Sequence, residues 1–137
     1  MSYFLLFSDN ILGEEAADIS RNRIIIGGFS QGGAVAITTL IRDTKNSPLA
    51  GCIALSTYFP GTKPTMGEKI QEKLHTPVLQ CHGDSDEMIS FERGQLTANL
   101  LKDLVKEHTF MKFPYMGHEC NEEELSCVKD FINKTLQ

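Results

Sequence analysis

The pentapeptide Gly-Phe-Ser-Gln-Gly at residues 28–32 constrains the fold of this chain more than any other stretch, because of what flanks it. The apolar run 23–27 precedes it, and a run of small and apolar residues, 33–41, follows it. This order predicts a buried strand, a sharp turn and a helix. We expect Ser30 to adopt a strained, positive-φ conformation on that turn. We expect Gly28 and Gly32 because the neighbouring backbone would come too close for a Cβ atom.

A serine that follows a strand on a sharp turn and opens a helix is typical of a nucleophile elbow. The start of the helix carries partial positive charge, which favours an anion beside the hydroxyl. Gly-rich turns of this kind also bind phosphates. However, residues 27–32 match neither the dinucleotide fingerprint nor the Walker pattern, which needs Gly-Lys-Ser/Thr at its end. Ser30 is therefore a candidate nucleophile, and a chance pentapeptide is the alternative.

A carboxylate and then a histidine follow downstream. Residues 76–83 read as a buried strand that ends in a Gly turn, and Asp84 and Asp86 come directly after it. A helix over about 91–106 and a strand over 109–113 then lead to a loop that holds His118. The carboxyl ends of parallel strands share one rim of a sheet, where ligands bind. We therefore expect the serine, one aspartate and the histidine to meet in space, in the chain order of α/β-hydrolases.

The residue types suit acyl transfer. A serine hydroxyl needs a base to take its proton, and histidine has an unperturbed pKa near neutrality. A carboxylate orients the imidazole and stabilises the imidazolium. Either Asp84 or Asp86 could instead be a turn residue, and His118 could be a solvated loop histidine. His82, at the end of its strand, is expected to be structural.

Three motifs together resemble the acyl-protein thioesterase family, which is also called the lysophospholipase/carboxylesterase family. They are the octapeptide 27–34, the run Gln-Cys-His-Gly-Asp-Ser-Asp at 80–86, and the Gly-His pair at 117–118 before a terminal helix. The resemblance covers about residues 23–137 of what we interpret as one domain, 1–137. It implies an α/β-hydrolase fold, here truncated, with a mainly parallel sheet and flanking helices. It also implies cleavage of thioesters such as palmitoyl-cysteine on proteins, or of lysophospholipids and small acyl esters, without a cofactor or metal.

The resemblance also assigns residue roles. Ser30 matches the family's nucleophile, Asp86 its acid and His118 its base. The family's acid is the second aspartate of a His-Gly-Asp-x-Asp run, which favours Asp86 over Asp84. The backbone N–H of Gln31 matches one oxyanion donor.

Other positions concern the acyl pocket and the departures from the family pattern. The segment 56–60 resembles the family's stretch beside the acyl pocket, so Tyr58 and Phe59 are candidate substrate-binding residues. Glu87 stands where the family usually has proline, and Glu119 where it often has serine. Each departure adds negative charge beside a candidate catalytic position.

Residues 1–22 do not match the N-terminal part of the domain in this family. We find no early strand followed by the His-Gly loop that supplies the second oxyanion donor, and losing one donor typically costs about 2.7–4 kcal/mol. The alternative function is therefore a catalytically weak or inactive member that acts as an acyl-binding or interaction module. The strand at 24–26 would also present an unpaired apolar edge. The apolar run 3–7 could cover that edge, a second copy could pair there as a homodimer, or the chain could be a fragment.

Composition excludes some partners. Thirteen basic and eighteen acidic residues give a net charge of −5, which argues against nucleic acid and against docking on anionic membranes. No apolar run reaches the ~18–20 residues of a membrane span. The apolar start is too short for a signal peptide and lacks a basic residue. These observations predict a cytoplasmic protein without a transmembrane segment.

The remaining patterns concern the core. Cys52 and Cys81 are expected to be buried thiols, and Cys120 and Cys127 form no CxxC pair that would indicate zinc. The connection 57–75 is expected to hold a short helix near 68–74. Two apolar stripes at helical spacing are expected to face the core: Leu96, Leu100 and Leu104, flanked by Leu101 and Val105, in the first helix; Leu125, Val128, Phe131, Ile132 and Leu136 in the last.

Overall fold

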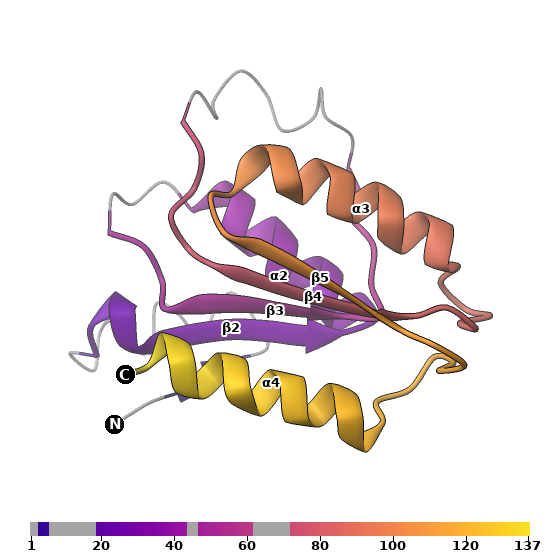
Figure 1. Ribbon diagram of the computed structural model, residues 1–137. Helices are drawn as coiled ribbons and strands as arrows, with labels where there is room; N and C mark the ends of the chain where they lie inside the picture. The colour runs from indigo at the N-terminus through magenta and orange to yellow at the C-terminus, as the bar shows by residue number, and fades with distance from the viewer. Residues whose placement is uncertain (1–2, 6–18, 44–46, 62–71) are drawn as a thin grey trace.

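A parallel sheet in the order β1-β2-β3-β4-β5 organises the chain (Figure 1). The computed structural model describes residues 3–5, 19–43, 47–61 and 72–137. The strands are β1 (Tyr3–Leu5), β2 (Ile24–Phe29), β3 (Gly51–Leu55), β4 (Val78–Gly83) and β5 (His108–Phe113). The helices are the 3-10 turn η1 (Arg21–Arg23), α2 (Gln31–Arg42), α3 (Phe91–Leu104) and α4 (Glu122–Thr135). The predicted α/β architecture with a mainly parallel sheet is confirmed.

Helices cover the sheet on both faces. Figure 1 shows α2 and α3 on one face and α4 on the other. Ile24, Ile26 and Cys52 share one core cluster with apolar residues of α2 and α3. Ile25 and Ile53 lie in the second cluster, where α4 packs. Because both faces are covered, β3 and β4 are buried along their whole length, as is usual for strands of a parallel sheet.

The edge of β2 is paired. Tyr3 stands opposite Ile24, and Leu5 stands opposite Ile26, in a parallel register. Of the three possibilities for that edge, the structure shows pairing with the N-terminal apolar run, through residues 3–5. Residues 6 and 7 of the same apolar run lie outside the described part of the chain.

Two predicted helix bounds differ from the structure. The helix expected over 91–106 ends at Leu104, because Val105 turns to an extended conformation and bridges Leu74. The short helix expected near 68–74 falls largely outside the described residues. Leu74 itself belongs to that bridge and not to a helix.

The two apolar stripes face the core only in part. Leu96 is 64% exposed and Leu125 is 51% exposed, which corrects the expectation for both. Toward the sheet, α3 instead turns the small residues Gly94, Thr97 and Ala98, together with Leu101 and Leu104. Small side chains let the helix approach the strands closely, and Leu96 lies outside this contact.

The cysteines are free thiols. Cys52 and Cys81 are buried as expected, and burial raises the pKa of the Cys52 thiol to about 12. Cys120 is exposed and Cys127 is half-buried. Within the described ranges, no helix has the length and apolar character needed to cross a membrane.

Candidate active site

The turn between β2 and α2 has the strained geometry that the sequence predicts. Ser30 has φ 56° and ψ −119°, in a region that L-residues seldom adopt. Its N–H donates to the carbonyl of Leu55 at 2.8 Å. The hydroxyl of Thr57 donates to the Ser30 carbonyl at 2.5 Å. The last residue of β3 and Thr57, shortly after it, therefore hold both backbone groups of Ser30 and fix the strained backbone.

The glycines around Ser30 have different reasons for being glycine. A Cβ on Gly28 would lie 2.2 Å from the carbonyl carbon of Gly32, so the predicted close approach is confirmed there. A Cβ on Gly32 would meet no atom within 4 Å, so that expectation for Gly32 was wrong. Gly33 is the second tight position, because a Cβ there would lie 2.6 Å from the Thr57 side chain.

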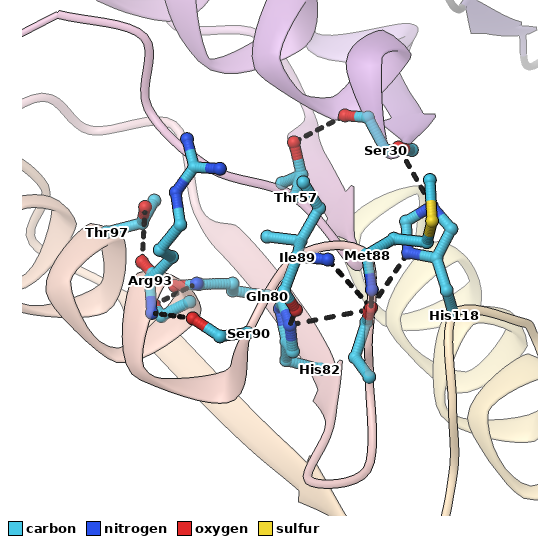
Figure 2. A network of polar contacts seen from close by, with 12 residues as sticks. Ser30, Thr57, Gln80, His82, Met88, Ile89, Ser90, Arg93, Thr97 and His118 are labelled. Carbon is cyan, nitrogen blue, oxygen red and sulfur yellow. Dashed lines mark hydrogen bonds and ion pairs between the residues drawn. The ribbon is translucent and has the colours of Figure 1, made fainter.

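The structure brings Ser30, Asp86 and His118 together at the carboxyl ends of three strands. The Ser30 hydroxyl lies 2.9 Å from Nε2 of His118, and Figure 2 shows these two side chains pointing toward one another. Nδ1 of His118 lies 2.9 Å from Oδ2 of Asp86. Because a carboxylate can only accept, Nδ1–H donates to Asp86, and Nε2 is left to accept from the serine hydroxyl.

The turn after β4 gives Asp84 and Asp86 different hydrogen-bond partners. Asp86 is 7% exposed, and its Oδ1 accepts from the N–H groups of Met88 and Ile89, each at 2.9 Å. Burial raises the pKa of Asp86, but the hydrogen bonds from His118 and the two backbone amides outweigh it and leave the pKa below its ordinary value. Asp86 is therefore ionised at neutral pH.

Asp84 contacts the backbone of the loop that carries His118. Its side chain is partly exposed, and Oδ1 accepts from the N–H of Tyr115 at 2.7 Å. Tyr115 has φ 63° in the loop that carries His118. A Cβ on Gly83 would lie 2.1 Å from the carbonyl oxygen of Met116 in the same loop. Asp84 and Gly83 thus hold the His118 loop against the end of β4.

The His118 ring lies at a partly apolar rim. The ring of Phe29 packs against it, with centroids 4.7 Å apart and planes tilted by 43°. The imidazole is 18% exposed and thus reachable from solvent. Glu87 and Glu119, the two departures from the family pattern, are exposed, so water screens their charge.

The candidate substrate residues lie to one side of this group. Tyr58 and Phe59 line a pocket of about 410 Å³, together with Leu96, Thr97 and Leu100 of α3. Ser30 and His118 are not among its lining residues. Phe59 also packs on the core, and the Arg93 guanidinium lies 4.6 Å from the centre of the Tyr58 ring. Gln31 is exposed and opens α2, so its N–H lies in the first turn of that helix, whose amides lack carbonyl partners within the helix.

Sequence reasoning missed several supporting residues. Thr57 and the amides of Met88 and Ile89 were not singled out, because their roles depend on contacts between distant segments. Position was the one feature of the sequence that could have indicated them. Thr57 comes shortly after a predicted strand, and Met88 and Ile89 come shortly after a candidate acid. The described residues contain no cluster of three His, Cys, Asp or Glu side chains that could hold a metal.

Comparison with known proteins places the chain in a family. A family model described as phospholipase/carboxylesterase matches residues 4–136. Acyl-protein thioesterase 1 of Neurospora crassa is 37% identical over 95% of this chain and 53% of its own length. Acyl-protein thioesterase 1 homolog 1 of Dictyostelium discoideum is 36% identical over 89% of this chain and 53% of its own length. The chain thus spans about half the length of these curated relatives.

Solved structures agree with this placement. The crystal structure of Arabidopsis thaliana SOBER1 superposes with a TM-score of 0.83 at 30% identity, over 95% of this chain and 63% of that one. Zea mays acyl-protein thioesterase 2 shares the fold, with a TM-score of 0.73 at 24% identity. With its match over residues 4–136 and its parallel sheet, the chain belongs to the phospholipase/carboxylesterase family of α/β-hydrolases.

Proposed function

We propose that this chain carries a serine hydrolase centre that cleaves acyl thioesters or carboxylic esters. The observation that supports it most is the continuous hydrogen-bonded series from Ser30 through His118 to Asp86, with both contacts at 2.9 Å. The family of the chain supports the class of reaction. Substrates of the proposed kind are acylated proteins, lysophospholipids and small acyl esters.

The proposed reaction has two steps. The Ser30 oxygen attacks the acyl carbonyl carbon while Nε2 of His118 takes the hydroxyl proton. The tetrahedral intermediate then collapses, and His118 returns the proton to the departing thiolate or alkoxide. Water, deprotonated by His118 in the same way, attacks the acyl-serine. The bond between the acyl carbon and the Ser30 oxygen then breaks, His118 returns the proton to that oxygen, and the carboxylic acid leaves. Asp86 holds the imidazole in the required tautomer and stabilises the imidazolium.

Three further residues are proposed to take part. The N–H of Gln31, at the positive start of α2, donates to the developing oxyanion. Tyr58 and Phe59 contact the acyl chain in the pocket beside α3, which is apolar enough for a hydrocarbon. The proposal needs no metal or organic cofactor, because every proton transfer has a donor and an acceptor among these side chains.

Ser30→Ala tests the proposal directly. A fluorophosphonate probe should label the wild-type chain and not this variant, and turnover of p-nitrophenyl esters and of a palmitoyl thioester peptide should be lost with it. Thr39→Ala, in α2 and away from the turn that carries Ser30, is the control and should behave as wild type. Equal labelling of wild type and Ser30→Ala would remove Ser30 from the mechanism. Binding of an acyl ligand without turnover would favour the acyl-binding module instead.

A further inference from the structure

A second histidine, His82, lies directly behind Asp86 and takes no part in the proposed proton transfers. Its side chain is fully buried at the end of β4. Nε2 of His82 lies 2.7 Å from the carbonyl oxygen of Ile89 and 3.5 Å from Oδ2 of Asp86. Packing alone does not explain why a histidine is buried this close to Asp86.

The contacts define the tautomer of His82. A carbonyl oxygen can only accept, so Nε2 carries a proton and donates it to Ile89. Nδ1 has no hydrogen-bond partner among the described residues. A Cβ on Gly94 would lie 2.6 Å from Nδ1, so the backbone of α3 closes off that side of the ring. The ring is therefore fixed with its single strong contact directed at the loop over residues 86–89.

Ile89 connects His82 to the acid. The Ile89 carbonyl accepts from His82, and the Ile89 N–H donates to Oδ1 of Asp86 at 2.9 Å. With Oδ1 held by two amides, Oδ2 is the oxygen presented to His118. In Figure 2, His82 lies at the end of this network farther from Ser30, and His118 lies at the end next to Ser30.

The ring of His82 is itself held in place. Phe91, the first residue of α3, packs edge-on against it with centroids 6.0 Å apart. Gln80 of β4 donates from Nε2 to the Gly94 carbonyl at 2.8 Å, which anchors the same turn of α3 beside the ring. A shift of His82 would therefore be transmitted to the loop that ends at Ser90, and with it to Asp86.

We infer that His82 is a positioning residue: through the Ile89 carbonyl it fixes the loop that presents Oδ2 of Asp86 to His118. This inference rests on the proposed function, because it assigns His82 to the support of the proposed acid. It gives His82 no contact with substrate. Removal of its N–H leaves the Ile89 carbonyl buried without a donor, and the loop then shifts to find another.

The test compares three substitutions in the full chain. His82→Leu removes the donor at similar volume. His82→Gln keeps an N–H near the position of Nε2, whereas His82→Asn places its N–H near Nδ1, short of Ile89. His82→Leu and His82→Asn should lower kcat by about 10–100-fold with little change in KM, and His82→Gln should recover most of it. The exposed His75→Gln is the control. Fluorophosphonate titration corrects each rate for the fraction of intact sites.

A double-mutant comparison separates positioning from a general packing defect. In an Asp86→Asn background, His82→Leu should cause no further loss of kcat, because its effect passes through Asp86. If His82→Leu does not fold, the Asn and Gln pair carries the comparison.

An NMR measurement tests the inference even if the chain proves to have no esterase activity. Long-range ¹H–¹⁵N spectra of histidine-labelled protein should show His118 with its proton on Nδ1 in wild type and in His82→Gln, and a mixture of tautomers in His82→Asn. Unchanged tautomers and unchanged kcat in His82→Leu and His82→Asn would overturn the inference. Absent turnover in wild type, with the tautomer shift present, would instead overturn the proposed function alone.

Discussion

The two aspartates of the turn after β4 differ in the neighbour that each carboxylate reaches. Asp86 faces Nδ1 of His118, whereas Asp84 accepts from the N–H of Tyr115. Asp86→Asn should reduce kcat by about 10⁴-fold, because an amide no longer dictates the tautomer of His118. Asp84→Asn keeps an acceptor for Tyr115 and should lose less than about tenfold. Ester turnover of the purified variants measures both, and equal losses would contradict the assignment of the acid.

The carboxylate of Asp86 makes the free energy of unfolding depend on pH. The pKa of Asp86 in the folded chain lies below its ordinary value, so folding favours the ionised form. Its contribution is complete above the unfolded pKa of about 3.9 and is lost as the pH falls through the folded value. Urea unfolding of wild type and Asp86→Asn should therefore show a difference in unfolding free energy at pH 7 that shrinks below about pH 4. A difference that grows toward acid would contradict this sign.

At the scale of elements, the junction of β2 and α2 depends on close backbone packing. A Cβ on Gly28 would overlap the backbone of Gly32, which cannot move without displacing the helix. Gly28→Ala should cost about 3 kcal/mol or more of unfolding free energy. Gly32→Ala meets open space and is the matched control, with stability near that of wild type. Urea denaturation compares the two, and a tolerated Gly28→Ala would mean that the turn is more adaptable than this packing implies.

The first turn of α4 buries a carboxyl group. Glu124 is fully buried, and within the described residues neither side-chain oxygen has a hydrogen-bond partner. Burial raises the pKa of Glu124, and the nearby Cys120 thiol offsets this only in part. Stability from this group is complete below its unfolded pKa of about 4.3 and is lost as the pH rises through the higher folded value.

Replacing Glu124 should therefore stabilise the fold at high pH. Glu124→Met should raise the unfolding free energy at pH 8 by about 1–3 kcal/mol, the usual cost of a buried polar group without a partner. The gain should shrink at pH 4. Glu123→Met, exposed in the same turn, is the control and should show no such pH dependence. A destabilised Glu124→Met at pH 8 would mean that the carboxylate has a partner that favours it.

The order of strands and helices, and the proximity of Ser30, Asp86 and His118, could be predicted from the sequence, because both depend on short local patterns. The strand-turn-helix around Ser30 and the position of His118 after β5 follow from periodicity and motif order. Burial of Leu96 and Leu125 could not be predicted in this way. Helical spacing shows that a stripe exists, but the small residues Gly94 and Ala98 decide which face of α3 meets the sheet. The roles of Thr57 and His82 depend on contacts between segments that no local pattern encodes.

At the scale of the whole molecule, the sheet ends at the short strand β1, which pairs with the edge of β2. β1 pairs with β2 over only three residue pairs, Tyr3–Ile24 to Leu5–Ile26. Without that pairing, β2 would expose backbone N–H and C=O groups along an apolar strand, which invites association with another chain. The strand β1 should therefore act as an edge cover even though it is short.

Deleting residues 1–5 tests this role. The deletion should lower the unfolding free energy by about 1–3 kcal/mol, the net value of a few backbone hydrogen bonds. It should also raise the mass measured by light scattering relative to the full chain at equal concentration. A synthetic peptide of residues 1–7 should reverse the mass increase, and a scrambled peptide of the same composition should not, because pairing needs the register opposite Ile24 and Ile26. An unchanged mass and unchanged stability would mean that β2 is protected without β1, and the short strand would then contribute nothing to the closure of the sheet.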